Sequence, residues 1–341
     1  MKLHLLALLS LLFRSRSGDF TVAGIPLGAP RGLKAKKASK NHHKQSYEKC
    51  QFVKKCAKSF EELQEAIVEA VHGEFLGICG NIRVDSTPIR IVKSDVTLVG
   101  CCTKTKCAIH GSGKAPNLVV TGGDFSLFNV IVEDGHCDST SGQGGGNLHF
   151  RSPQGGSLTV VDSEFRNGVC DIQGAGNVDV STTGSVTFRR TAFKNGKATF
   201  KYSGGGAFVT ESFDIIVDGC LFDGNKEIGL ALYSGSGDGP FEAVIKDSVF
   251  LNNEGGPAGG IFYSDFGSMQ RLEVLRTEFT SNTATDEDGA GAAQISQNIV
   301  SNPTTFFWDG NFGSGNRGPA CPDVLYYWDK CFTVDSTYVP S

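Results

Sequence analysis

The chain has 341 residues, of which 39% are hydrophobic and 20% are charged, so it can bury a large core and does not belong to the disordered class. Its net charge of −4 conceals two unequal parts. Residues 14–58 carry 12 Lys and Arg against two acidic residues, whereas residues 59–341 carry 19 Lys and Arg against 34 Asp and Glu. An acidic body of this kind argues against a nucleic-acid partner, because phosphate backbones are bound by basic surfaces.

The N-terminal segment, residues 1–18, is predicted to be a signal peptide, because a single lysine precedes an apolar run of the usual length. Residues 14–18 lack the small-residue pattern of a cleavage site, so an uncleaved anchor and a mistaken start codon are the alternatives. We expect a protein that is secreted or held at the cell surface. Residues 19–58, which are basic and have no apolar period, are predicted to form a flexible linker.

A short helix is predicted at residues 59–72, ahead of the main body of the chain. Ser59 is a favourable N-cap, Glu62 completes a capping box, and Gly73 follows the last apolar position. The apolar residues of this segment fall on one helical face, so the helix can cover the open end of a repeat structure.

An internal repeat dominates residues 144–294. Its clearest members are five phenylalanines separated by 28 or 29 residues: Phe165, Phe193, Phe222, Phe250 and Phe279. Alternating apolar and polar residues precede each Phe, and a Gly-rich phrase followed by a second alternating run completes the period. Two or three short strands per period, with no room for a crossover helix, predict an all-β parallel β-helix (solenoid) of about eight coils over residues 59–300.

Like residues are expected to stack on like in adjacent coils. The Phe row should form an internal aromatic ladder. An asparagine follows each Phe by two or three residues, and this row should form an amide ladder in one turn: Asn167, Asn195, Asn225, Asn252 and Asn282. Cys220 belongs to a row of small residues before the Phe row, so it is predicted to be a buried free thiol.

The 11 cysteines of an exported protein are expected to be mostly paired. Close spacing favours three pairs: Cys50–Cys56, Cys321–Cys331, and Cys107 with either Cys101 or Cys102. Cys79 lies about one turn before the Cys101–Cys102 dipeptide and is placed to staple adjacent coils. A zinc site is the alternative for the cysteines at 101, 102 and 107, although a second ligand pair at zinc spacing is missing.

Residues 88–111 contain the pattern I-R-I-V-K-S-D-V-T-L-V-G and end in I-H-G. Together with the preceding helix, this stretch resembles the opening coils of secreted right-handed β-helix proteins of the pectin-lyase-like superfamily. The resemblance covers residues 59 to about 300, and it implies a right-handed solenoid that binds or modifies a polysaccharide along an outer strand face. The catalytic signatures of the polygalacturonase, pectate-lyase and alginate-epimerase families are absent from the sequence, so no catalytic residue is carried over.

One outward row after the Gly-rich phrase is the candidate site. Adjacent coils lie about 4.8 Å apart, which places His149 and Asp179 at the same register with Arg151 beside them. A base, a carboxylate and a cation within reach suit cleavage of a glycosidic bond or removal of a proton α to a uronate, so these three are the predicted catalytic residues. The substrate-binding residues predicted on the same face are Glu211, Tyr233, Tyr263 and Asp265.

No cofactor is predicted, and calcium is the alternative. Its sites would be Asp134 and the Asp286-Glu287-Asp288 run, whose oxygen atoms suit this ion. The expected partner is a polysaccharide or cell-wall glycan, with no nucleic acid and no membrane contact beyond an uncleaved N-terminal anchor. The protein is expected to be a monomer.

Residues 301–341 are predicted to form an aromatic C-terminal cap, held by Cys321 and Cys331 and containing both tryptophans of the chain. A sugar-binding platform is the alternative role for these aromatic residues. Two functions are open at this point. One is an enzyme that acts on an acidic polysaccharide, and the other is a non-enzymatic structural or adhesive protein of the cell wall or matrix.

Overall fold

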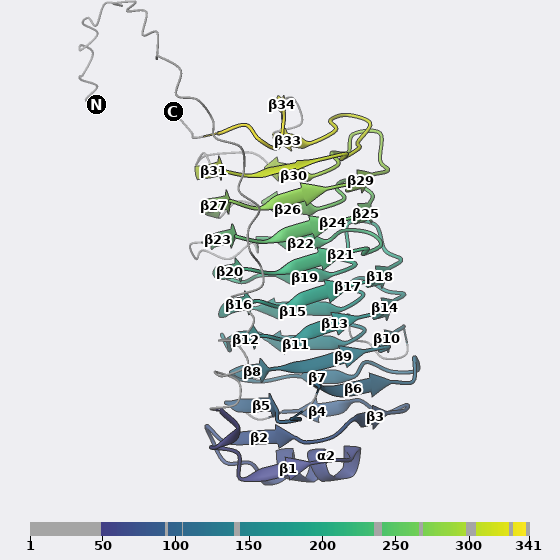
Figure 1. The fold of residues 1–341 in the computed structure, drawn as a ribbon, viewed down its shortest axis with the longest axis vertical. Coiled ribbons are helices and arrows are strands. Elements are labelled where there is room, and N and C mark those ends of the chain that lie inside the picture. Colours follow the sequence, from purple (N-terminus) through teal and green to yellow (C-terminus); the bar gives the residue numbers. More distant parts are fainter. Residues whose placement is uncertain are drawn as a thin grey trace, which may run out of the picture. The chain divides into compact units, whose positions relative to one another are not determined.

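The computed structural model describes residues 49–92, 95–103, 105–139, 144–234, 241–265, 269–297, 305–326 and 330–338. The predicted signal peptide and residues 19–48 of the predicted linker lie outside these ranges. Within them the chain winds into stacked coils that pass in turn through three long sheets (Figure 1). No described helix is long and apolar enough to cross a membrane.

Three long sheets, here called A, B and C, and a short sheet D form the coils. Sheet A contains β1 (Lys55–Ala57), β2 (Phe75–Ile78), β5 (Val96–Gly100), β8 (Phe125–Phe128), β12 (Leu158–Val161), β16 (Ser185–Arg189), β20 (Asp214–Asp218), β23 (Phe241–Lys246), β27 (Met269–Leu275) and β31 (Thr305–Asp309). Sheet B contains β3 (Ile82–Val84), β6 (Cys107–Gly111), β9 (Val130–Glu133), β13 (Glu164–Arg166), β17 (Ala192–Lys194), β21 (Leu221–Asp223), β24 (Val249–Leu251), β28 (Glu278–Thr280) and β32 (Phe312–Ser314). Sheet C contains β4 (Ile89–Ile91), β7 (Leu118–Val120), β11 (Leu148–Ser152), β15 (Val178–Thr182), β19 (Ala207–Thr210), β22 (Leu230–Tyr233), β26 (Ile261–Asp265), β30 (Ala293–Gln297), β33 (Val324–Tyr326) and β34 (Lys330–Phe332).

Sheet D is short and lies between sheets B and C along the chain. It contains β10 (His136–Cys137), β14 (Val169–Cys170), β18 (Lys197–Ala198), β25 (Glu254–Gly255) and β29 (Thr283–Ala284), with Lys226 bridging β18 and β25. All described strand pairs are parallel except β33 with β34. The parallel β-helix predicted from the repeat is therefore confirmed. Sheet B, with one strand per coil, has nine strands, compared with the expected eight or so coils.

The interior is filled by stacked apolar side chains. The five Phe rings of the repeat are fully buried and nearly parallel, with neighbouring centroids 4.6 to 5.6 Å apart. The Trp308 ring adds a sixth member, 5.1 Å from Phe279. The aromatic ladder is thus confirmed and extends one coil further than the Phe period shows. Cys220 is 2% exposed and unpaired, as predicted, and burial raises the pKa of its thiol to about 12.

The asparagine row divides into two rows, which corrects the prediction of one ladder. A buried ladder links side-chain amides at 2.7 to 3.5 Å, with no member from the coil of β16 to β19: Asn117, Asn147, Asn177, Asn225, Asn253, Asn282 and Asn316. The other three predicted members, Asn167, Asn195 and Asn252, are exposed and have left-handed backbone angles. The prediction failed because Asn117, Asn147 and Asn177 enter the ladder from the segment before sheet C rather than from the position after sheet B.

The N-terminal end of the solenoid is closed by α2 (Phe60–Glu69), which ends three residues before the predicted boundary. Ser59 Oγ accepts a hydrogen bond from the Glu62 amide at 3.2 Å, and the Glu62 carboxylate accepts one from the Lys58 amide at 2.7 Å. Leu63, Ala66 and Ile67 bury the apolar face of the helix against the first coil. The capping role is therefore explained by one helical face and its hydrogen-bonded N-terminus.

The last ten residues of the predicted linker are part of the fold. β1 pairs with β2, and Lys49 Nζ lies 3.4 Å from the centroid of the Phe128 ring on sheet A. Two disulfides hold this segment, Cys50–Cys101 and Cys56–Cys79, so the predicted pair Cys50–Cys56 is wrong. The two cysteines are six positions apart, but Cys56 lies on β1 and bonds to Cys79 just after β2, whereas Cys50 precedes β1 and bonds to Cys101 just after β5. Spacing along the chain could not reveal this arrangement.

The remaining disulfides are Cys102–Cys107, Cys137–Cys170 and Cys321–Cys331. The first and last agree with the predicted spacing, and the pairing of Cys102 replaces the zinc alternative. Cys137 and Cys170 face each other in register on β10 and β14, a staple between adjacent coils that the sequence did not reveal.

The coil pattern continues beyond residue 300, into the predicted cap. β31, β32 and β33 extend sheets A, B and C by one strand each. Trp308 and Phe306 are fully buried, and the Trp308 indole donates to the Val334 carbonyl at 2.8 Å. Trp308 and Phe306 therefore plug the end of the core, whereas Phe312 is 47% exposed. A sugar platform at this end stays a prediction. Tyr327 and Trp328 lie outside the described residues.

Candidate functional site

The first outward row of sheet C is covered, although it points away from the core. From β7 to β33 the row comprises the second residue of each strand and is buried: Val119, His149, Asp179, Phe208, Ala231, Phe262, Gln294 and Leu325. The cover is the segment that precedes each strand, in which Gly145, Ala175 and Gly204 pair from coil to coil. A Cβ on Gly145 or Gly204 would collide with the carbonyl oxygen of Leu148 or Ala207, so only glycine lets the chain fold back this closely.

His149 and Asp179 lie in register on β11 and β15, as predicted. Their Nδ1 and Oδ2 atoms are 2.9 Å apart, and the two residues are only 8% and 7% exposed. Arg151 lies two residues further along β11, in the next outward row, where it is exposed and opposite Ser181. The structure therefore brings the base and the carboxylate together beneath the Gly-rich cover. A catalytic role for the three residues stays a prediction.

Two of the predicted substrate-binding residues lie at strand ends. Glu211 follows β19 with a φ of 64°, is exposed, and accepts a hydrogen bond from Ser181 Oγ at 3.0 Å. Asp265 ends β26 and pairs with Gln297, and its side chain is outside the described part of the structure.

Tyr263 does not face the solvent, and its predicted contact with a sugar is wrong. It is 0% exposed and packs in the core beside Phe241, with ring centroids 6.0 Å apart. Tyr233 pairs in register with Ser264, so the outward positions of β26 are Phe262 and Ser264. The assignment had slipped by one residue, and a slip of one residue in a strand exchanges the inner and outer faces.

An aromatic cluster, here called the outer aromatic cluster, lies on sheet C from β19 to β26. It consists of Tyr202, Phe208, Tyr233 and Phe262, whose neighbouring ring centroids are 5.1 to 5.6 Å apart. Tyr233 Oη donates to the Tyr202 carbonyl at 2.8 Å, and burial raises the pKa of its phenol. Tyr202 is 37% exposed, and Phe200, two residues before it, is 54% exposed.

Sequence reasoning included Tyr233 but missed Phe200 and Tyr202. A usable signal was present, because Phe200 and Tyr202 stand in a connection, where large aromatic residues are unusual, directly before the Gly204-Gly205-Gly206 phrase. An exposed aromatic pair of this kind in a loop more often marks a contact surface than a structural need.

The segments that connect sheet D to sheet C differ in length around this cluster. Two short segments, 227–229 and 256–260, lie between two longer ones, 199–206 and 285–292. Lys201 of one long segment reaches Asp286 of the other, with Nζ and Oδ2 3.1 Å apart. Because β22 and β26 lie between β19 and β30 in sheet C, this ion pair spans the two coils with short segments.

Glu227 lies on the short segment 227–229 and is the second carboxylate near Lys201. Burial raises the pKa of Glu227, the charge of Asp286 raises it further, and a hydrogen bond with the Gly256 backbone opposes the shift. Its Oε2 atom is shielded from solvent and has no hydrogen-bond partner within the described residues. Both carboxylates meet at Gly256, where an added Cβ would lie 3.0 Å from Asp286 Oδ2.

Gln294 follows Phe262 in the same covered row. The residue is 1% exposed, and neither polar atom of its side chain has a hydrogen-bond partner within the described ranges. Buried polar atoms are nearly always paired in native proteins, so an unpaired one indicates a position for water or a ligand.

Metal binding finds little geometric support in the described residues, where no group of three or more His, Cys, Asp or Glu side chains could hold an ion. Asp286 is engaged by Lys201, and Asp134 accepts a hydrogen bond from Asn167 at 3.0 Å. Calcium binding stays a prediction.

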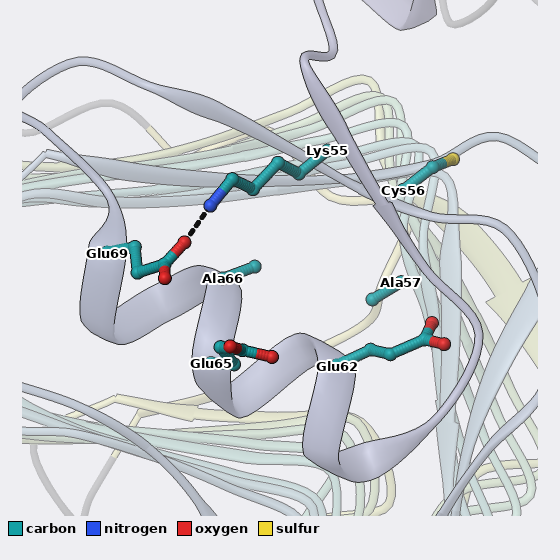
Figure 2. Close-up of a pocket in the computed structure, with 7 residues that line it drawn as sticks. All are labelled: Lys55, Cys56, Ala57, Glu62, Glu65, Ala66 and Glu69. Carbon is teal, nitrogen blue, oxygen red and sulfur yellow. Dashed lines mark hydrogen bonds and ion pairs between the residues drawn. The ribbon is translucent and has the colours of Figure 1, made fainter.

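A pocket of about 350 Å³ lies at the N-terminal end, between β1 and α2. Figure 2 shows the Lys55 side chain reaching across it to Glu69, with Glu62 and Glu65 on the same helix. The ion pair holds the pKa of the Glu69 carboxyl below its usual range. Since the pocket is lined only by β1 and α2, it belongs to the end cap and not to the outward face of sheet C.

Comparisons with known proteins bear on the fold. Searches of curated proteins and of solved structures found no match. The sequence profile of the right-handed β-helix region matches residues 117–304, more than half of the chain and the part that contains the Phe ladder and the outer aromatic cluster. The coils, the stacked rows and this match together show that the chain belongs to the right-handed β-helix family.

Proposed function

We propose that this protein is a secreted glycan-binding protein that holds a polysaccharide on the outward face of sheet C. The observation that carries the proposal is the outer aromatic cluster with its exposed Tyr202 ring and the neighbouring exposed Phe200. Aromatic faces pack against the C–H face of a sugar ring, and a row of rings along a solenoid suits a linear chain.

The disulfides support an extracellular location. Five disulfides occur within the described residues, and structural disulfides form and persist in oxidising compartments. The predicted signal peptide agrees with this location, although it lies outside the described residues.

Catalysis on the bound glycan is the second candidate, favoured by the contact between His149 and Asp179. A carboxylate that orients an imidazole is a common arrangement for a general base. The low exposure of both residues requires that the Gly-rich cover open before a substrate reaches them. The binding function needs no such movement.

The test is a binding screen against neutral, acidic and amine-bearing polysaccharides by affinity electrophoresis, with and without calcium. We expect retardation by at least one glycan. Tyr202→Ala should weaken that binding roughly fivefold or more, since each aromatic contact contributes about 1 kcal/mol. Arg189→Ala, an exposed change on sheet A, is the control and should leave binding unchanged. No retardation by any glycan, or equal effects of the two variants, would refute the proposal.

The same panel distinguishes binding from turnover. Reducing ends and the absorbance of unsaturated products are followed for the wild type and for His149→Ala. Product formation that depends on His149 would establish the catalytic candidate, whereas binding without products would leave the protein as a binding module.

A further inference from the structure

The side chain of Lys201 shows which kind of group fits beside the outer aromatic cluster. Its ammonium lies 3.1 Å from Asp286 Oδ2 and 5.0 Å from the centroid of the Tyr202 ring. Hydrogen bonding with Asp286 raises the pKa of this ammonium. A carboxylate together with an aromatic face is a favourable environment for an organic cation.

The site holds more negative charge than Lys201 neutralises. The Glu227 carboxylate hydrogen bonds with the Gly256 backbone, and Asp286 Oδ2 lies beside the same glycine. The charge of Asp286 raises the pKa of Glu227 and the charge of Lys201 lowers it. Lys201 forms an ion pair with Asp286, whereas Glu227 Oε2 has no hydrogen-bond donor within the described residues. The amide of Gln294, which is next to Phe262 in the covered row of sheet C, is also buried and unpaired within the described residues. The unpaired Glu227 oxygen indicates that the site can accept a further donor.

The charge of the site excludes one class of glycan and favours another. A polyuronate would bring its carboxylates against Glu227 and Asp286, on a body that carries 34 acidic against 19 basic residues. A neutral glycan would use the aromatic rings but leave the carboxylates unused. An amino sugar offers both a ring face and an ammonium.

We infer that the site takes a glycan with free amino groups, in which one sugar ring stacks on Tyr202 while its ammonium binds between Glu227 and Asp286. This inference rests on the proposed function and names the substrate class of the same site. Lys201 occupies the ammonium position in the free protein. Its side chain is 56% exposed, so it can leave toward the solvent when the sugar binds.

This competition predicts effects of opposite sign for neighbouring residues. Glu227→Gln and Asp286→Asn remove the carboxylates and should weaken binding of an amine-bearing glycan. Lys201→Met removes the competing ammonium and keeps much of the side-chain length, so it should strengthen that binding. A merely structural ion pair between the two long segments would predict losses in all three variants.

The experiment measures Kd by calorimetry for hexamers of glucosamine, N-acetylglucosamine and galacturonate, slightly below neutral pH. We expect glucosamine hexamer to bind roughly tenfold more tightly than its acetylated counterpart, with a preference that falls as salt is added. Glu227→Gln should abolish the preference for the glucosamine hexamer over the acetylated hexamer, while the acetylated hexamer still binds. Lys201→Met should increase this preference. Lys246→Met and Asp218→Asn provide a matched Lys–Asp pair on sheet A, 3.7 Å apart, and should change nothing.

The outcomes separate the two proposals. Equal or tighter binding of the acetylated or galacturonate hexamer would overturn the amino-sugar inference but leave glycan binding intact. Failure of all three hexamers to bind would overturn the amino-sugar inference, and together with no retardation in the polysaccharide screen it would refute the proposed function itself. Hexalysine that binds as tightly as glucosamine hexamer, with no loss in Tyr202→Ala, would identify a site for basic peptides and also overturn the inference.

Discussion

The coils change direction between sheets A and B in a manner quite different from that between sheets D and C. From sheet A to sheet B every coil after β8 turns on one residue with a φ of 47° to 63°: Asn129, Asp162, Arg190, Gly219, Asp247, Arg276 and Gly310. From sheet D to sheet C the connecting segments range from three residues, 227–229, to ten, 138–147. The first region therefore maintains the coil geometry, whereas the second can vary without disturbing the strands.

The turn from sheet A to sheet B accommodates residues that do not favour a positive φ, because hydrogen bonds to the adjacent coil stabilise them. Arginine has no intrinsic preference for a positive φ, yet Arg190 and Arg276 adopt one. Each donates two hydrogen bonds to the aspartate at the same turn of the preceding coil, Asp162 at 2.7 and 3.0 Å and Asp247 at 2.8 Å. Geometry at this corner is thus maintained by contacts between coils, whereas the D-to-C segments carry exposed aromatic and charged groups.

The largest expected effect tests the regular interior. Phe222→Ala removes a ring that stacks 4.6 Å from both Phe193 and Phe250, and we expect a loss of about 3–5 kcal/mol in the free energy of unfolding. Phe279→Ala should cost as much, because Trp308 stacks on its other side. Phe165 pairs with Val132 on one side, so Phe165→Ala should cost less. Urea melts that show the same loss for all three would argue against a stacked ladder.

A smaller effect contrasts two neighbouring asparagines at the same corner. Asn253→Ala leaves the Phe222 carbonyl and the amides of Asn225 and Asn282 without their partners, at a cost of about 3 kcal/mol. Asn252 is exposed with a φ of 53°, a conformation that glycine adopts freely, so Asn252→Gly should change stability by less than about 0.5 kcal/mol. If chemical denaturation gave equal losses, the division into a buried and an exposed asparagine row would be wrong.

The smallest expected effect concerns the variable region and depends on pH. The folded protein raises the pKa of Glu227, mainly through burial, so it binds this proton more readily than the unfolded chain does. The free energy of unfolding of the wild type is therefore lower at a pH above this pKa, and it rises as the pH falls through the pKa. Glu227→Gln should raise Tm near neutral pH, and the increase should shrink on acidification.

Thermal melts of Glu227→Gln at several pH values check this expectation. Glu242→Gln, at an exposed position of β23, serves as the control and should give a small shift that does not vary in the same way. A Tm difference for Glu227→Gln that grows toward acid pH would reverse the sign and contradict the burial of Glu227.

Much of the fold could be predicted because stacking translates position in the sequence directly into position in space. The Phe spacing of 28 or 29 residues predicted the ladder, and the small-residue row predicted the buried Cys220 thiol. The His149 and Asp179 register was also predicted correctly. Each of these features repeats within one sheet, where a constant turn preserves the period.

The candidate site was predicted less well, because it depends on segments of unequal length. Counting by two from the Gly-rich phrases placed Tyr263 outside, although β26 turns it inward. Phe200 and Tyr202 were missed because they have no counterpart in neighbouring coils. The cover over His149 was missed because it follows from a chain reversal at Gly145, and alternation within a strand carries no information about it.

The sequence by itself determined the parallel β-helix, its Phe ladder and its capping helix, since these follow from periodicity and from the local chemistry of Ser59 and Glu62. Only the tertiary structure decided the partners of Cys50 and Cys56 and the contact between Lys201 and Asp286, which lie 85 positions apart. These contacts form where chain segments of different lengths reach residues of neighbouring coils. A period records what each coil has in common with the next, and so it cannot encode the irregular contacts between them.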